Sequence, residues 1–173
     1  GVVRHRLYRG GIGSGKTVTG AVDVGCVAHE NPGCTGLYVA PTYTMLQDIA
    51  LPDIEDVIGR ASDDAGFRVA RFQKGRYLWR FYNGYRLFMR SADRADRLRG
   101  LTISHAWIDE SEVIQPPMYT WNILLGRMRE TSRPPWRMQA YQSILVMTTP
   151  SGPTGIVGHF IQQIKNQEPG YAV

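Results

Sequence analysis

With 173 residues, 43% of them hydrophobic and 20% charged, the chain is long and apolar enough to bury the core of one globular domain. No apolar run approaches the roughly 20 residues that a membrane-spanning helix needs, and no signal peptide is visible at the start. The net charge is +5, and the two cysteines, Cys26 and Cys34, are fewer than the about four ligands of a zinc site, so we expect reduced thiols.

The first half of the chain alternates between predicted strands and helices. A short strand leads into the glycine-rich stretch GGIGSGKT, and the helix after it ends at Asn31-Pro32-Gly33. The apolar run TGLYVA is typical of a buried parallel strand, here closed by Pro41. Pro52 falls at a break or in the first turn of the next helix. The predicted strands span 2–8 and 35–40, and the predicted helices span 16–29 and 44–61.

The middle of the chain combines a hairpin signal with a band of basic residues. Two alternating aromatic runs, 76–82 and 85–90, flank Asn83-Gly84, and such a pair predicts a two-residue turn because both turn positions need positive φ. Residues 60–99 hold eleven basic and four acidic residues, so this window carries +7 and the rest of the chain −2. The band suits a polyanion such as nucleic acid, or it is simply the solvated surface of an arginine-rich protein.

The second half continues the alternation, with strands over 103–108 and 143–147 and helices over 111–130 and 155–166. Strands that alternate with helices imply a mainly parallel central sheet flanked by helices. The predicted fold class is therefore α/β, a P-loop NTPase of the RecA/helicase-like kind with an added β-hairpin around 76–90. We expect residues 1–173 to form this single domain, cut from a longer protein because the chain begins with Gly.

The stretch after the first strand has the GxxxxGK[ST] pattern of a phosphate-binding loop. Glycines let backbone N–H groups turn toward phosphate oxygens, and the helix that follows adds the positive end of its dipole. Lys16 is expected to reach the β- and γ-phosphates, and Thr17 to bind Mg²⁺. The predicted ATP-binding residues are Gly10, Gly11, Ile12, Gly13, Ser14, Gly15, Lys16 and Thr17.

Two further motifs follow predicted strands, and ligands bind at the carboxyl ends of parallel strands. The strand AWI ends in Asp109-Glu110, where an Asp organises the magnesium of P-loop nucleotidases and a carboxylate beside it serves as general base for water. A kinase must keep water from the γ-phosphate, so this pair favours a hydrolase. Thr148-Thr149 follows the strand SILVM, where a hydroxyl can hydrogen-bond toward the γ-phosphate or the catalytic Glu.

An arginine can neutralise the charge that develops on the transferred phosphoryl group. Arg99 stands in RLRG just before the Asp-Glu strand, but spacing alone does not choose between it and Arg94, Arg127 or Arg129.

Together these residues resemble the ATPase domain of the large terminase subunit, the DNA-packaging motor of tailed bacteriophages, over about residues 8–152. GGIGSGKT is similar to that family's Walker A loop, and SHAWIDESE to its Walker B segment with the catalytic Glu. VAPTYTML resembles motif Ia, SADRADRLRG the segment before Walker B, and TTPSG the coupling motif.

The resemblance implies a function and partners. Glu110 would be the catalytic base, Asp109 the magnesium-organising acid, Thr149 a coupling residue, and Arg99 an arginine finger supplied in trans. Many terminases carry a basic residue where this chain has Ile12, so the source of a cis arginine stays open, with Arg9 as one substitute. ATP and Mg²⁺ are the implied cofactors.

The implied partners are double-stranded DNA, the portal protein and the small terminase subunit. The chain would form a ring on the capsid in the cytoplasm of the infected bacterial host and be mostly monomeric in isolation. No nuclease activity is expected, because nothing after Gly152 supplies an acidic metal-binding cluster. The alternatives are a helicase-like DNA-dependent ATPase, which would need a second RecA-like domain, and a nucleotide-binding assembly module without turnover.

Overall fold

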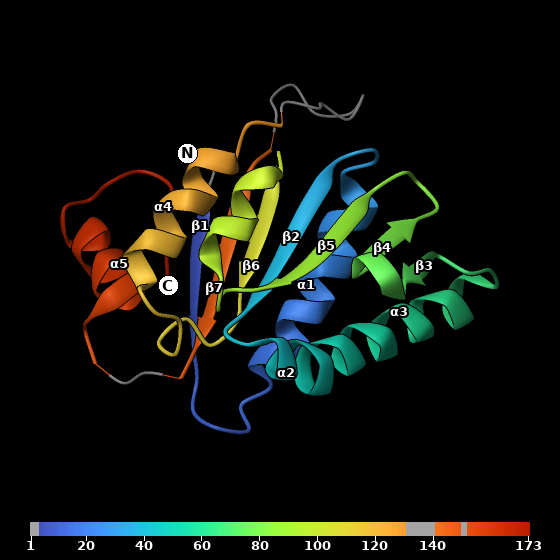
Figure 1. Cartoon of the computed structure of the whole chain (residues 1–173), viewed down its shortest axis with the longest axis horizontal. Coiled ribbons are helices and arrows are strands. Elements are labelled where there is room, and N and C mark those ends of the chain that lie inside the picture. Colours follow the sequence, from blue (N-terminus) through green and yellow to red (C-terminus); the bar gives the residue numbers. More distant parts are fainter. Residues whose placement is uncertain (1–3, 131–140, 150–151) are drawn as a thin grey trace.

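A computed structural model describes residues 4–130, 141–149 and 152–173, and within them eight strands form one sheet (Figure 1). Along the sheet the strands lie in the order β3-β4-β5-β2-β6-β7-β1-β8. The strands are β1 (His5–Arg9), β2 (Thr35–Ala40), β3 (Ala70–Gln73), β4 (Leu78–Phe81), β5 (Arg86–Ser91), β6 (His105–Ile108), β7 (Ser143–Thr148) and β8 (Tyr171–Ala172). The helices are α1 (Lys16–Glu30), α2 (Tyr43–Met45), α3 (Leu51–Ala65), α4 (Pro117–Arg127) and α5 (Gly155–Lys165), with a π-helical turn η1 (Leu46–Ala50) and 3₁₀ turns η2 (Lys74–Arg76) and η3 (Ala95–Gly100).

The sheet is mainly parallel, as the alternation of strands and helices predicts. From β5 to β8 every neighbouring pair is parallel, and only β3 and β4 run the other way. The central strands β2, β6 and β7 are buried along their whole length, which explains their continuous apolar sequences. Consequently the carboxyl ends of β1, β2, β6 and β7 lie at one edge of the sheet.

Two apolar layers hold helices against the two faces of the sheet. On one face Tyr38, Trp107 and Met147 pack against α1 and α3. On the other face Leu37 and Val146 pack against α4, α5 and η3. Figure 1 shows this division, with α4 and α5 over β1, β7 and β6 and α3 beside the hairpin strands.

One glycine sets how closely α1 approaches the sheet. A Cβ added to Gly20 would lie 2.3 Å from the Sδ atom of Met147 on β7, so only glycine allows this spacing without a shift of the methionine. Because α1 begins directly after the glycine loop, this contact also fixes the loop relative to the end of β7.

The structure confirms the hairpin, since β4 and β5 pair antiparallel around Asn83-Gly84. The prediction of a helix over 111–130 is wrong at its beginning: residues 111–116 form turns, and α4 begins at Pro117. Proline is tolerated in a first helical turn but disfavours helix in the residue before it. The segment predicted as one helix over 44–61 is divided into α2, η1 and α3, and β3 and β8 had no prediction.

Candidate nucleotide site

The glycine loop connects the end of β1 to the start of α1. Gly13 and Gly15 have φ of 75° and 76°, in the left-handed region that favours glycine. The hydroxyl of Tyr8 donates to the carbonyl of Ser14 at 3.3 Å, which ties the loop to β1. No side chain caps the N-terminus of α1, so its first N–H groups are available to an anion.

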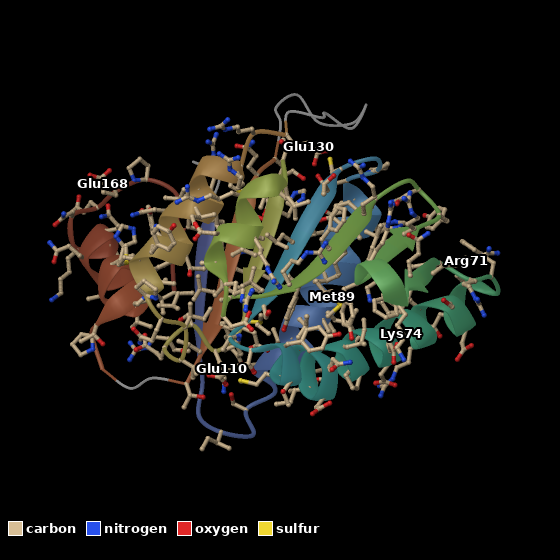
Figure 2. All side chains as sticks on the ribbon, in the orientation of Figure 1. Arg71, Lys74, Met89, Glu110, Glu130 and Glu168 are labelled. Atoms are coloured by element: carbon tan, nitrogen blue, oxygen red, sulfur yellow. The ribbon has the colours of Figure 1, made fainter. Side chains whose placement is uncertain are left out.

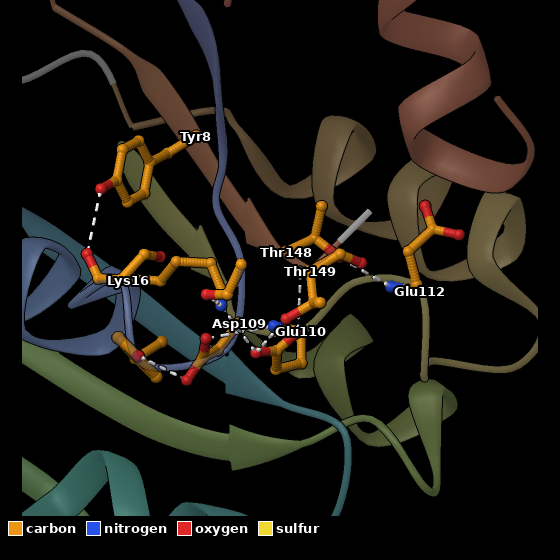
Figure 3. A network of polar contacts seen from close by, with 10 residues as sticks. Tyr8, Lys16, Asp109, Glu110, Glu112, Thr148 and Thr149 are labelled. Atoms are coloured by element: carbon orange, nitrogen blue, oxygen red, sulfur yellow. Dashed lines mark hydrogen bonds and ion pairs between the residues drawn. The ribbon is translucent and has the colours of Figure 1, made fainter. Parts of the chain in front are cut away.

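Lys16 lies inside the loop and faces the end of β6 (Figure 3). The residue is 6% exposed, and its Nζ donates to the carbonyl of Gly11 at 3.0 Å and lies 3.4 Å from Oε1 of Glu110. The ammonium group therefore has a carbonyl and a carboxylate as its partners in place of a phosphate.

Glu110 is held from two sides. Its backbone has φ of 41°, an unusual conformation for a residue other than glycine, and its side chain turns back between β6 and β7. The backbone N–H of Thr149 donates to Oε2 at 3.0 Å, and the Thr149 hydroxyl donates to Oε1 at 3.2 Å. The carboxylate thus joins the glycine loop, through Lys16, to the end of β7 (Figure 3).

Asp109 is 4% exposed, and both of its carboxylate oxygens accept a hydrogen bond. Tyr38 of β2 donates its hydroxyl to Oδ2 at 3.0 Å, and the backbone N–H of Glu110 donates to Oδ1 at 3.1 Å. Burial raises the pKa of the Asp109 carboxyl to about 6; the Glu110 charge also raises this pKa, whereas the Tyr38 hydrogen bond and the Lys16 charge lower it. Burial, together with the charge of Asp109, raises the pKa of Tyr38 well above its usual value, so this hydroxyl stays a donor.

These residues surround a cavity of about 320 Å³. Its walls are residues 12–18 of the loop and α1, together with Glu110, Thr149 and Asp53. Asp53, from the first turn of α3, was not predicted, and it has no hydrogen bond or ion pair with any described residue. A more open hollow of about 800 Å³ lies between α3 and β3, but no glycine loop lines it.

The donor groups at this cavity fit a magnesium nucleotide. Mg²⁺ takes oxygen ligands and is usually held by one or two protein groups together with waters and substrate phosphates. Thr17 lines the cavity with a hydroxyl, and Asp109 offers a carboxylate beside it at the end of β6. In the part of the chain that the structure describes, no three His, Cys, Asp or Glu side chains cluster as an all-protein metal site.

A family model places the chain. The N-terminal domain of the terminase large subunit, T4likevirus-type, matches residues 7–170. The chain belongs to this family. A search of curated proteins finds no match.

Solved structures of phage terminases share the fold of this terminase domain. The HK97 bacteriophage large terminase is 10% identical with a TM-score of 0.75, and the match covers 98% of this chain and 34% of that chain. For the large terminase of a thermophilic bacteriophage the values are 13%, 0.74, 95% and 38%. For the Thermus phage P74-26 large terminase ATPase domain they are 19%, 0.58, 92% and 64%. This chain therefore spans less than two thirds of each of these chains, and at such identities the likeness shows the fold alone.

Two residues that the sequence singled out lie away from the walls of this cavity in the terminase domain. Thr148 is buried, and its hydroxyl accepts from the N–H of Glu112 at 3.4 Å. Arg99 is on the opposite face of the sheet from α1, where Nε lies 3.1 Å from Asp96 and Nη2 donates to the Tyr119 hydroxyl at 2.6 Å.

The tip of the loop is apolar and open. Ile12 is 96% exposed, and Arg9 at the end of β1 is exposed as well. Pro150 and Ser151 of the coupling motif lie outside the described residues. No helix in the described part of the chain is long and apolar enough to span a membrane.

Proposed function

We propose that this domain hydrolyses ATP to ADP and phosphate with Mg²⁺, and that the hydrolysis drives double-stranded DNA into a capsid. The contact of Lys16, Glu110 and Thr149 at the phosphate-binding loop carries this proposal, because it joins a phosphate ligand, a base for water and the end of a neighbouring strand. Family membership supports the motor role. Large terminase of a thermophilic bacteriophage has been solved with ADP and with ATP-gamma-S, which supports a nucleotide ligand here.

Each residue has a role in the proposed reaction. The N–H groups of the loop and of the first turn of α1 bind the β- and γ-phosphates, and Lys16 moves from Glu110 to a phosphate oxygen. Glu110 then accepts a proton from water as the water oxygen bonds to the γ-phosphorus and the bond to the ADP oxygen breaks. Thr17 and Asp109 would hold Mg²⁺, which neutralises charge on the phosphate oxygens.

Coupling to movement is assigned to Thr149 and the strand before it. Glu110 accepts both of its threonine hydrogen bonds from Thr149, so any shift of this carboxylate toward a water or a phosphate pulls on the end of β7. Arg99 is assigned to the active site of a neighbouring subunit, since it is exposed and lies away from its own cavity. The portal protein and the small subunit remain the proposed partners of the assembled ring.

The test is Glu110→Gln with Glu55→Gln, an exposed glutamate on α3, as the matched control. The amide keeps the size of the side chain but cannot take a proton, so we expect ATP binding to persist and phosphate release to fall by about 10²-fold or more. Calorimetry measures binding, and a phosphate assay measures turnover. Normal turnover in Glu110→Gln would remove the catalytic assignment, and failure of the wild-type chain to bind ATP would overturn the nucleotide site.

A further inference from the structure

Three arginines stand side by side across the three hairpin strands. Arg71 of β3 is the register partner of Arg80 of β4, and Arg80 is the register partner of Arg86 of β5. All three residues are exposed. Since neighbouring strands lie about 4.8 Å apart, three positive charges follow one line across the sheet.

The row lies on a face of the sheet that no helix covers. Side chains alternate along a strand, and Trp79, Phe81 and Leu87 point into the layer shared with α1 and α3. The arginines between them must point to the opposite face. There α4, α5 and η3 pack over β6, β7 and β1 and leave the hairpin strands open (Figure 1). Figure 2 shows Arg71 at the outer edge of the molecule.

The row has little compensation within the chain. Arg71 and Arg80 have no hydrogen bond or ion pair with any described residue. Only Arg86 has partners, the Thr35 hydroxyl at 2.7 Å and Glu130 at 3.8 Å. Like charges directly opposite each other on neighbouring strands destabilise a sheet. An alignment that opposes folding and lacks an acidic neighbour is what a surface for an anionic partner requires.

We infer that Arg71, Arg80 and Arg86 form a binding site for the phosphate backbone of nucleic acid. Guanidinium groups bind phosphates through two parallel N–H donors, and such contacts fix position without reading sequence. The inference rests on the proposed function, which supplies double-stranded DNA as the polyanion. Residues 60–99 as a whole carry +7, so the row lies within the basic part of the chain.

The site lies away from the nucleotide. Arg86 opens β5 beside Thr35, which opens β2, so the row is near the amino ends of the parallel strands. The glycine loop and Glu110 follow the carboxyl ends of β1 and β6. Neutral substitutions in the row are therefore expected to leave nucleotide binding unchanged, which separates the two proposals in one experiment.

The test compares Arg71→Gln/Arg80→Gln with Arg60→Gln/Lys165→Gln, a control that removes two exposed charges from α3 and α5. Binding of a mixed-sequence DNA duplex is measured over a range of salt concentrations, and ADP binding is measured in parallel. Each phosphate contact contributes about 0.9 to the slope of log K against log salt, so the row variant should lose about 2 from the slope and roughly tenfold or more in affinity. The control should stay close to wild type, and Arg71→Lys/Arg80→Lys should recover most of the binding.

An unchanged slope in the row variant, or an equal loss in the control, would overturn the binding site. The same holds if the wild-type chain binds ADP but no duplex, a result that leaves the nucleotide site standing and would point to an acidic protein surface as the partner of the row. If the wild-type chain binds no nucleotide, the proposed function fails whatever the DNA result.

Discussion

Asp109 keeps both carboxylate oxygens engaged within the chain, one by Tyr38 and one by the backbone of Glu110. Lys16, Asp109, Glu110 and Thr149 could be predicted because each follows a predicted strand directly and belongs to a spaced motif. Tyr38 could not, since TGLYVA is an apolar run in which a tyrosine has no distinguishing mark. Asp53 is one of several acids on an amphipathic helix, and only the packing of α3 against α1 brings it to the cavity.

Tyr38→Phe tests whether this hydroxyl orients the metal-binding carboxylate. The substitution removes one donor without changing the packing of the ring, so Asp109 keeps only its backbone partner. We expect ADP affinity in the presence of Mg²⁺ to fall by about tenfold, the effect typical of a group that orients a metal ligand, and ADP affinity in EDTA to stay unchanged. Titration calorimetry measures both, with Tyr82→Phe at an exposed site as the control. Equal losses with and without Mg²⁺ would indicate a general packing defect instead.

The helices and strands follow the sequence wherever an apolar pattern is long. The buried runs of β2 and β7 and the Asn-Gly hairpin were predictable for this reason. Short strands were not: β3 and β8 have four and two residues, and their pairing depends on neighbours that come from distant parts of the chain. The same holds for the end of the sheet at β1, where His5 packs between the rings of Trp121 and Tyr171.

His5 gives this packing a pH dependence. Burial, then the charges of Arg4 and His159, lowers the pKa of His5 to about 4. Below about pH 6.5 the unfolded chain takes up a proton that the folded chain refuses, so stability is full above this pH and falls as the pH drops toward 4.

In His5→Phe the ring is kept and the titration is lost. The drop in Tm between about pH 7 and pH 4.5 should therefore be smaller in His5→Phe than in wild type. Thermal unfolding followed by circular dichroism measures it, and His29→Gln, an exposed histidine, is the control. An equal drop in wild type and His5→Phe would exclude His5 as the source.

At the scale of the whole molecule, the two ends of the parallel strands have different roles. The carboxyl ends carry the nucleotide cavity, and the amino ends lie near the arginine row. Arg99 belongs to neither. It is exposed beside Tyr119 and Asp96, on the face opposite α1, where it is free to approach another subunit. Neither the sequence nor one chain can place it in an active site, because its partner would be a second copy.

Mixing subunits tests Arg99 in trans. Arg99→Ala and Glu110→Ala are each expected to be inactive when assembled alone, and the isolated chain is expected to be mostly monomeric and weakly active. In a mixed assembly, a subunit with intact Glu110 can lie beside one with intact Arg99, so partial ATPase activity should return at intermediate ratios. Phosphate release across a series of ratios measures it. If activity stays absent at every ratio, Arg99 does not act on a neighbouring subunit.

The pairing of β1 with β7 also determines when the site can exist during folding. Leu7 is the register partner of Val146, so two strands from nearly opposite ends of the chain must meet before Lys16 can reach Glu110 and Thr149. Closing so long a loop carries an entropic cost and makes such contacts slow to form. No partly folded segment can hold the phosphates, so bound nucleotide adds RT ln(1 + [L]/Kd) to the unfolding free energy of the complete domain. Nucleotide binding is thus a direct report that the last parallel strand has joined the sheet.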